Sequence, residues 1–263
     1  MIKQITTSSL VAAILCMAQN ATAHDSIKDV LTEGVAGYTA EVIGHGCANE
    51  AKVYSSVKSQ SVLFPIGDAA TTRTIIDAPA TSTTAAITHE ESVGSLSQHL
   101  VAGKFDGAVS LIPDKNIFTK QAYKLNAQGA VIGYASTGGD LYTNETGTAK
   151  FRGLVPFYVA AQTFVKTSCA KSLKVKIAVA NVCDLGKGLA NTWIPSPKQL
   201  GVNEYKVASY NLDGVGSPVT LTINRDLTKN PLPTSGCPVE GGYDANVWPS
   251  AQDIDTYLPQ GLN

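Results

Sequence analysis

The chain has 263 residues, which is enough for one large all-β domain or two small domains. Its 20 basic and 21 acidic side chains nearly cancel, giving a formal net charge of −1, and no stretch gathers lysine and arginine into a cluster. Proteins that bind nucleic acid usually carry a basic patch, so the composition argues against a nucleic-acid partner.

The N-terminal 23 residues have the form of a secretory signal peptide. Lys3 gives a positively charged start, a short apolar run follows, and Ala21 and Ala23 occupy the small-residue positions of a cleavage site. Cleavage after Ala23 would leave a mature chain, 24–263, that begins with His24. We therefore expect export to the periplasm, the extracellular space or the cell surface.

Membrane attachment is not expected. No apolar segment approaches the about 20 residues that a membrane-spanning helix needs, so we predict no transmembrane segment. Cys16 raises the alternative of a lipoprotein, but Leu15 is not the small residue that precedes a lipidated cysteine.

Short apolar runs separated by Gly, Ser and Thr dominate the mature chain, a pattern that favours strands. Turn sequences at 126–129 and 213–216 each predict a β-hairpin, and only 92–103 has helical spacing. We predict an all-β fold, an antiparallel β-sandwich with long loops, one short helix and two disulfides, forming a single domain over 24–263. The expected strands lie at 61–65, 73–77, 107–113, 122–125, 130–136, 156–165, 174–182, 205–212 and 218–224.

The C-terminal stretch from Gly236 has little periodicity. We expect it to wrap the surface of the sandwich without regular structure, held there by Cys237, Tyr243 and Trp248.

The mature chain holds four cysteines, an even number that predicts two disulfides in an exported protein. The strand expected between Cys169 and Cys183 would hold their sulfurs roughly 25 Å apart, so these two are not expected to pair. Cys47 then pairs with Cys169 or with Cys183, and Cys237 takes the other. A zinc site is the alternative use of four cysteines, but no C-x-x-C spacing is present.

His24 is the first candidate metal ligand. As an N-terminal residue it offers an α-amino group and an imidazole Nδ1 that close a chelate ring on one ion, and nitrogen ligands of this kind suit copper. Asp25 is placed to add a carboxylate. The alternative is that His24 stands after the cleavage site by chance and has no role in metal binding.

His45 and His89 are the other candidate ligands. His45 lies between two glycines and two residues before Cys47, a placement that could preorganise it as a ligand. The alternative is that it is a buried, hydrogen-bonded imidazole at the end of a strand. His89 precedes Glu90 and Glu91, which could orient it, although Thr-His-Glu-Glu-Ser is also an ordinary helix entry. The fourth histidine, His99, is expected at a surface or partly packed position on the predicted helix.

Signatures of catalysis are scarce. The chain has no G-x-S-x-G elbow, no H-E-x-x-H, no Walker loop and no dinucleotide-binding G-x-G-x-x-G after a strand. We therefore expect a protein that is not an enzyme, with a hydrolytic site assembled only by the tertiary fold as the alternative.

A mature N-terminal histidine, then IGHGC at 43–47 and SVLFP at 61–65, resembles the YcnI family of secreted or membrane-tethered β-sandwich copper-binding domains. In that family the N-terminal histidine ligates copper together with an acidic side chain. The resemblance implies this role for His24, with Glu90 or Glu91 as the acid by position.

A longer series of segments, among them KLNAQGAVIGYAS, NTWIP and GYDANVWPSAQDID, is similar to copper-responsive surface proteins of the CorA type from methane-oxidising bacteria. Proteins of this type, and the related MopE type, use two histidines and an oxidised tryptophan in a W-x-H motif. Trp193 and Trp248 have no histidine beside them in sequence, so the resemblance does not extend to that ligand.

Together these features predict a copper-binding protein that captures, stores or delivers the ion without catalysing a reaction. The predicted nitrogen ligands are His24, His45 and His89, and the partners are the copper ion and a cell-surface or outer-membrane protein. A metal-free surface or adhesion module is the alternative.

Overall fold

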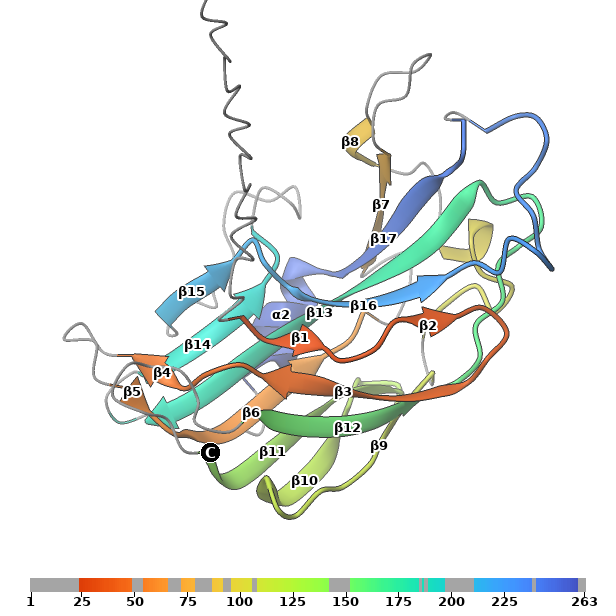
Figure 1. Cartoon of the computed structure of the whole chain (residues 1–263). Coiled ribbons are helices and arrows are strands. Elements are labelled where there is room, and N and C mark those ends of the chain that lie inside the picture. The colour runs from red at the N-terminus through yellow and green to blue at the C-terminus, as the bar shows by residue number, and fades with distance from the viewer. Residues whose placement is uncertain are drawn as a thin grey trace, which may run out of the picture.

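The structure is a computed structural model that describes residues 24–48, 54–65, 72–78, 87–91, 96–105, 108–141, 152–184, 186, 189–196, 211–237 and 240–259. The predicted signal peptide, 1–23, and most of the strand expected at 205–212 lie outside these residues. Two sheets form a β-sandwich, so the predicted fold class is confirmed (Figure 1).

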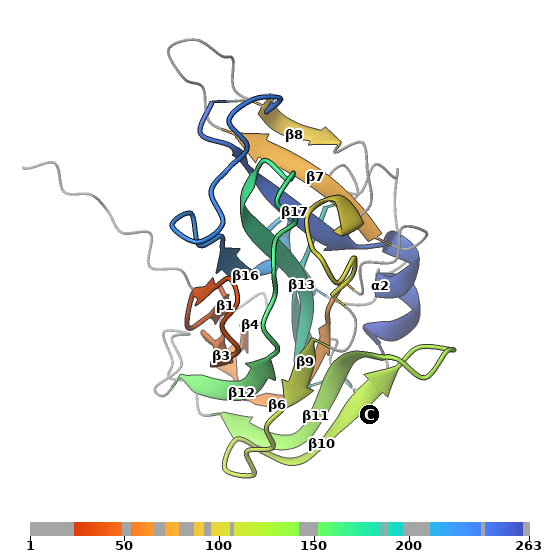
Figure 2. The ribbon, with the colours of Figure 1, turned by 90° about the vertical axis from the view of Figure 1, so that its right-hand side faces the viewer.

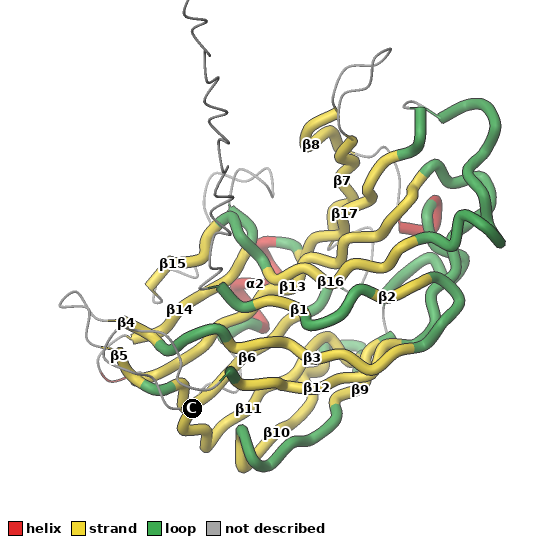
Figure 3. The backbone as a smooth tube through the Cα atoms, viewed as in Figure 1, coloured by secondary structure: helices red, strands yellow, loops and turns green. Residues whose placement is uncertain are grey.

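The smaller sheet has four strands in the order β1 (Ser26–Ile27), β3 (Gly37–Ile43), β12 (Gly153–Val159) and β9 (Val109–Leu111). The main path of the larger sheet is β10 (Phe118–Leu125), β11 (Val131–Leu141), β6 (Val57–Leu63), β13 (Ala170–Asp184), β17 (Tyr243–Pro249), β7 (Thr72–Ala78) and β8 (Ile87–Glu91). Four strands branch from it: β14 (Leu189–Ile194), β15 (Asn211–Val215), β16 (Val219–Asn224) and β2 (Leu31–Thr32). A separate hairpin joins β4 (Cys47–Ala48) to β5 (Tyr54–Ser55), and long loops connect many of the strands (Figure 3).

Strand β13 organises the large sheet because it changes partners along its length. Its first half pairs with β16 and β17, and its second half pairs with β6 and β14. Val175, Ile177 and Val179 enter the core shared by the two sheets. The alternate residues Ala178 and Ala180 enter a second core on the other face, which includes Ile254 of helix α2 (Ala251–Tyr257), and Figure 2 shows this helix beside the strands. Apolar residues therefore occupy both faces of β13.

The prediction of an irregular C-terminal stretch is wrong. Residues 243–249 form β17, an internal strand that runs parallel to β13 and antiparallel to β7. Helix α2 follows, with Ser250 as its N-cap accepting a hydrogen bond from the Asp253 N–H. Seven residues are too few for helical periodicity to stand out in the sequence, and the polar residues of β17 hide its alternation.

The two predicted hairpins differ in outcome. The turn at 126–129 joins β10 to β11 as expected, with Gly129 at a positive φ of 79°. The hairpin expected at 213–216 is wrong, because β15 pairs in parallel with β14 while β16 pairs with β13 and β2. The predicted helix over 92–103 is reduced, among the described residues, to one 3-10 turn, η1 (Leu96–Gln98).

Both disulfides join elements that are distant in sequence. Cys47 bonds to Cys183 and Cys169 bonds to Cys237, with Cα separations of 5.9 and 5.5 Å. Cys169 and Cys183 lie just before and near the end of the same strand, so the exclusion of their pairing is confirmed. Of the two pairings that the sequence left open, the structure selects the one that attaches the His45 segment to β13.

Candidate functional site

His24 and His45 meet at one buried tryptophan. Their rings lie edge-on to the indole of Trp193, with centroid distances of 4.8 and 5.7 Å and interplanar angles of 80° and 82°. Trp193 is fully buried and pairs with Val179 of β13. His24 is exposed whereas His45 is buried, so the pair reaches from the protein interior to solvent.

The environment of His45 defines which of its nitrogens is available. Its Nδ1 lies within hydrogen-bond distance of the Gly46 carbonyl oxygen, which can only accept. The Nδ1–H therefore donates to this carbonyl, and the neutral ring keeps its lone pair on Nε2. Asn191 Nδ2 donates to the same carbonyl oxygen at 3.3 Å, and Cys47 is fixed to Cys183. The imidazole is buried and hydrogen-bonded, as one of the two interpretations of the sequence had it, and its Nε2 remains a candidate ligand.

A cluster of polar side chains lies inside the sandwich beside this pair. Glu41 is an inward-facing residue of β3, where the alternation of the strand would otherwise place an apolar residue. Gln60 of β6 donates from Nε2 to Glu41 Oε2 at 2.7 Å and to Asn181 Oδ1 at 2.9 Å. Asn181 in turn donates to Asp25 Oδ2, and Asp25 Oδ1 accepts from the Gly44 N–H at 2.9 Å. One network thus links the residue after His24 to the strands on both sides of the core.

Burial disfavours the charged form of both carboxyl groups in this network. Burial raises the pKa of Glu41 well above its usual range, and the negative charge of Asp25 raises it further. Burial also raises the pKa of Asp25, although hydrogen bonds from Glu41, Gly44 and Asn181 oppose that rise. A protonated Glu41 that donates to Asp25 accounts for both effects. Glu41 Oε1 itself is buried without a hydrogen-bond partner of ordinary geometry.

The charge of the pair affects its neighbours. Burial raises the pKa of the Tyr134 hydroxyl well above its ordinary value, and the acids Glu41 and Asp25 raise it further. The Tyr134 hydroxyl and Gln60 Oε1 are buried without a hydrogen-bond partner of ordinary geometry. Buried polar groups are normally satisfied, so this concentration of unused groups marks the region as a functional candidate.

His89 is not brought to this cluster. It lies on β8, which pairs with β7 at the far edge of the large sheet, away from β1 and β4 in two views (Figures 1 and 2). Glu90 and Glu91, the acids suggested by the family resemblance, lie on the same strand. The acid next to His24 is Asp25, which hydrogen bonds through Asn181 and Gln60 connect to Glu41.

His99 is part of the hydrophobic core. Its ring lies edge-on to Tyr243 at 5.8 Å, and its Nδ1 is 3.1 Å from Ser168 Oγ. Burial lowers its pKa to about 4, so the ring is neutral at physiological pH. The expected surface or partly packed position is wrong, and a structural role is sufficient to explain this residue.

The described residues of the full-length chain do not form a complete set of side-chain ligands for a metal ion. Among the residues that the structure describes, no group of three or more His, Cys, Asp or Glu side chains is arranged to hold a metal ion. The nitrogen of His24 is a peptide nitrogen as long as residues 1–23 remain attached, so cleavage would add one further nitrogen donor at this position. The nitrogen donors then available beside Trp193 are two imidazoles and an amine, and nitrogen donors of this kind suit copper(II).

Comparison with known proteins adds no assignment. The chain matches no protein-family model, no curated protein and no solved structure. The likeness to YcnI and CorA proteins therefore stays a prediction that depends on the short motifs. In the part of the chain that the structure describes, no helix has the length and apolar character needed to cross a membrane.

Several residues of the cluster were not identified from the sequence. Glu41, Gln60 and Asn181 lie in strands whose inward faces are otherwise apolar, and Trp193 has no histidine beside it in the chain. Glu41 carried the clearest available signal, because an acid between Ala40 and Val42 interrupts an apolar run.

Glu41→Gln should make the protein more stable at pH 8. Because the pKa of Glu41 is raised in the folded state, the folded chain keeps a proton that the unfolded chain releases above about pH 4.5. The free energy of unfolding therefore falls as pH rises toward the folded pKa. Glutamine imitates the protonated acid and removes this slope, which urea unfolding between pH 5 and 8 would measure.

The exposed Glu240 provides a matched control, since Glu240→Gln should leave the slope unchanged. If the Glu41→Gln variant is less stable than the parent at pH 8, Glu41 is ionised in the folded protein and its charge is stabilised by hydrogen bonds, which would contradict the prediction.

Proposed function

We propose that the mature protein binds copper outside the cytoplasm and serves in copper capture, storage or delivery without catalysing a reaction. The observation that supports this most directly is that the imidazole rings of His24 and His45 both contact the indole of Trp193. His24 would bind through its α-amino group and imidazole after cleavage, and His45 would add Nε2.

The chemistry of the surroundings favours this assignment. Nitrogen donors suit copper(II), which leads the affinity order of divalent ions, and the four cysteines are held in disulfides and cannot act as thiolates. The Asp25 and Glu41 carboxyl groups place negative charge beside the proposed ion in an environment of low dielectric, where its effect is strong.

The location of β8 limits the ligand set. Because the backbone of His89 lies at the far edge of the large sheet, we place the site on His24 and His45 and treat His89 as a comparison residue. Two disulfides agree with an oxidising compartment, whether the periplasm or the cell surface. An acceptor protein at the surface or outer membrane would receive the ion.

One observation favours a metal-free surface or adhesion module as a second candidate. Tyr38 of β3 is 73% exposed and packs against Tyr158 of β12 at 5.2 Å, next to the half-exposed Leu154 on the outer face of the small sheet. Aromatic side chains in such positions are frequent in protein interfaces.

Copper titration of the metal-stripped mature protein tests the proposal. We expect one equivalent of copper(II) to bind with a sub-micromolar Kd, measured by calorimetry or a competing chelator. His24→Ala should weaken this by on the order of 100-fold, because one change removes an imidazole and the chelate ring. Acetylation of the His24 α-amino group should also weaken binding strongly, since it removes the amine as a donor while keeping the ring.

His89→Ala should bind as tightly as the parent. Weak binding of several ions, unaffected by His24→Ala, would contradict the copper site and favour the metal-free module.

A further inference from the structure

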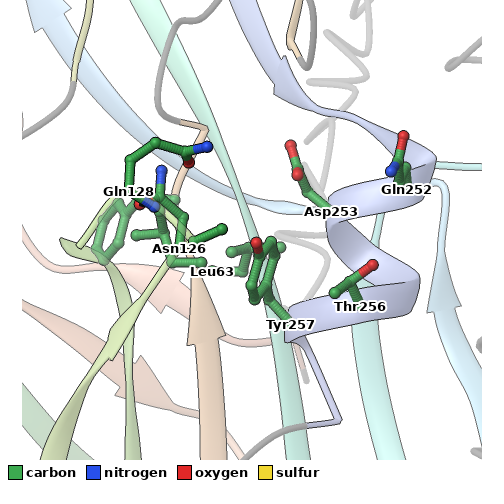
Figure 4. Close-up of a pocket in the computed structure, with 10 residues that line it drawn as sticks. Leu63, Asn126, Gln128, Gln252, Asp253, Thr256 and Tyr257 are labelled. Atoms are coloured by element: carbon green, nitrogen blue, oxygen red, sulfur yellow. Dashed lines mark hydrogen bonds between the residues drawn. The ribbon is translucent and has the colours of Figure 1, made fainter. Parts of the chain in front are cut away.

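A separate pocket lies on the other face of the large sheet. It has a volume of about 340 Å³ and is formed between helix α2 and the turn that joins β10 to β11 (Figure 4). Leu63 and Ile132 contribute an apolar floor. Gln128 comes from the turn, and Gln252, Thr256 and Tyr257 come from the helix (Figure 4). None of these residues belongs to the His24 cluster.

The walls of the pocket carry unused hydrogen-bonding groups. The side chains of Gln128, Gln252 and Thr256, and the hydroxyl of Tyr257, form no hydrogen bond within the described part of the chain. Asn126 uses Oδ1 within its turn, where it accepts from the Gln128 and Ala130 N–H groups at 3.1 and 2.8 Å, so its Nδ2 remains available. Planar amides and hydroxyls from two elements thus converge on one hollow.

Lys124 fixes the separation of the two walls. It lies on β10, next to the turn, yet it is almost fully buried, and its Nζ donates to the carbonyl oxygens of Tyr257 at 2.6 Å and Leu258 at 3.2 Å and to Ser61 Oγ. These two carbonyls are at the C-terminal end of α2, where a cation is favourable. The buried lysine therefore ties the helix to the β10 strand, and a pocket held in this way needs little ordering when a ligand binds.

The charge and shape of the pocket define its ligand. Among the described residues that line it there is no lysine or arginine and Asp253 is the one carboxylic acid, so an anionic ligand would find no counter-charge from them. An apolar floor with the ring of Tyr257, surrounded by amides and hydroxyls, suits a molecule with an apolar face and many hydroxyl groups. We propose that this pocket binds a neutral carbohydrate of one or two sugar units. Its volume of about 340 Å³ is at the lower end of the range for ligand pockets and suits a molecule of this size.

The proposal is tested by NMR titration of the isotopically labelled mature protein. The probes are glucose, galactose, mannose, N-acetylglucosamine, maltose and cellobiose, and the anionic comparison is glucose 6-phosphate. We expect at least one neutral sugar to shift the signals of Gln128, Gln252 and Thr256 at millimolar or lower concentration. A Gln128→Ala/Gln252→Ala variant should bind that sugar roughly tenfold more weakly, because two hydrogen-bonding groups are lost.

Tyr158→Ala serves as the matched control, since Tyr158 lies on the outer face of the small sheet, and it should leave sugar binding unchanged. Both exposed glutamines tolerate alanine without loss of core packing, so retained NMR dispersion will confirm that the double variant is folded. Three results would overturn the proposal. The first is no shift in these signals with any neutral sugar at about 20 mM, roughly 20 times a weak Kd of about 1 mM. The second is tighter binding of glucose 6-phosphate, and the third is sugar binding unaffected by the double variant.

Discussion

Replacing both Cys47 and Cys183 by serine should lower the free energy of unfolding by about 2 to 5 kcal/mol. The disulfide closes a loop over a sequence separation of 136 residues, so its loss greatly increases the freedom of the unfolded chain. The same change should weaken copper binding, because Cys47 lies two residues after His45 and Cys183 two residues after Asn181. Urea unfolding and copper titration of the same sample would measure both effects.

The second disulfide supplies the control. Cys169 and Cys237 are separated by 68 residues, half the distance, so their replacement by serine should cost about 0.6 kcal/mol less through loop entropy. Cys169 lies just before the start of β13 whereas Cys183 lies near its end, so this pair is away from His24 and His45, and its loss should leave copper affinity unchanged while the protein remains folded. Equal losses of copper affinity in the two variants would contradict a specific role for the Cys47–Cys183 bond.

Trp193→Ala should lower the free energy of unfolding by about 3 to 5 kcal/mol, in the upper range for single substitutions. The indole is fully buried in the core between the sheets, and both candidate histidines lie against it. Alanine leaves a large cavity and removes the surface that holds the two rings. Thermal or urea unfolding gives the stability, and copper titration of the folded fraction should show weaker binding.

Fluorescence locates the ion with less perturbation of the fold. In a Trp248→Phe variant only Trp193 remains, and one equivalent of copper(II) should quench most of its emission because the ligands contact the ring. In a Trp193→Phe variant, Trp248 remains in the second core beneath α2, beside Lys176, and its emission should change little. Quenching confined to Trp248 would place the ion elsewhere.

The local features of the fold could be predicted because each depends on neighbours in sequence. The turn at 126–129 forms because Asn126 and Gly129 satisfy the turn by themselves, through side-chain acceptance and a positive φ. The turn at 213–216 was misassigned because its chemistry is local, whereas the partners of β15 and β16 are chosen by β14 and β13.

The candidate site could be predicted only in part. His24 and His45 were identified because one follows the predicted cleavage site and the other is flanked by glycines and precedes a cysteine by two residues. The buried carboxyl pair was not identified as a pair, because Asp25 and Glu41 are 16 positions apart in the printed sequence and meet only when β1 and β3 pair. His89 was also predicted as a ligand, because its position in the sequence does not reveal that its strand lies at the far edge of the large sheet.

Four features follow from the amino-acid sequence alone: the strand-rich class, the number of disulfides, the exclusion of one cysteine pairing and the candidate histidines. Three others required the folded structure: the bond between Cys47 and Cys183, the internal strand in the C-terminal stretch, and the inward position of Glu41 beside Asp25. The physical reason is that side-chain alternation and turn chemistry act over a few residues. Sheet pairing and burial instead join segments whose separation along the chain carries no information about which of them will meet.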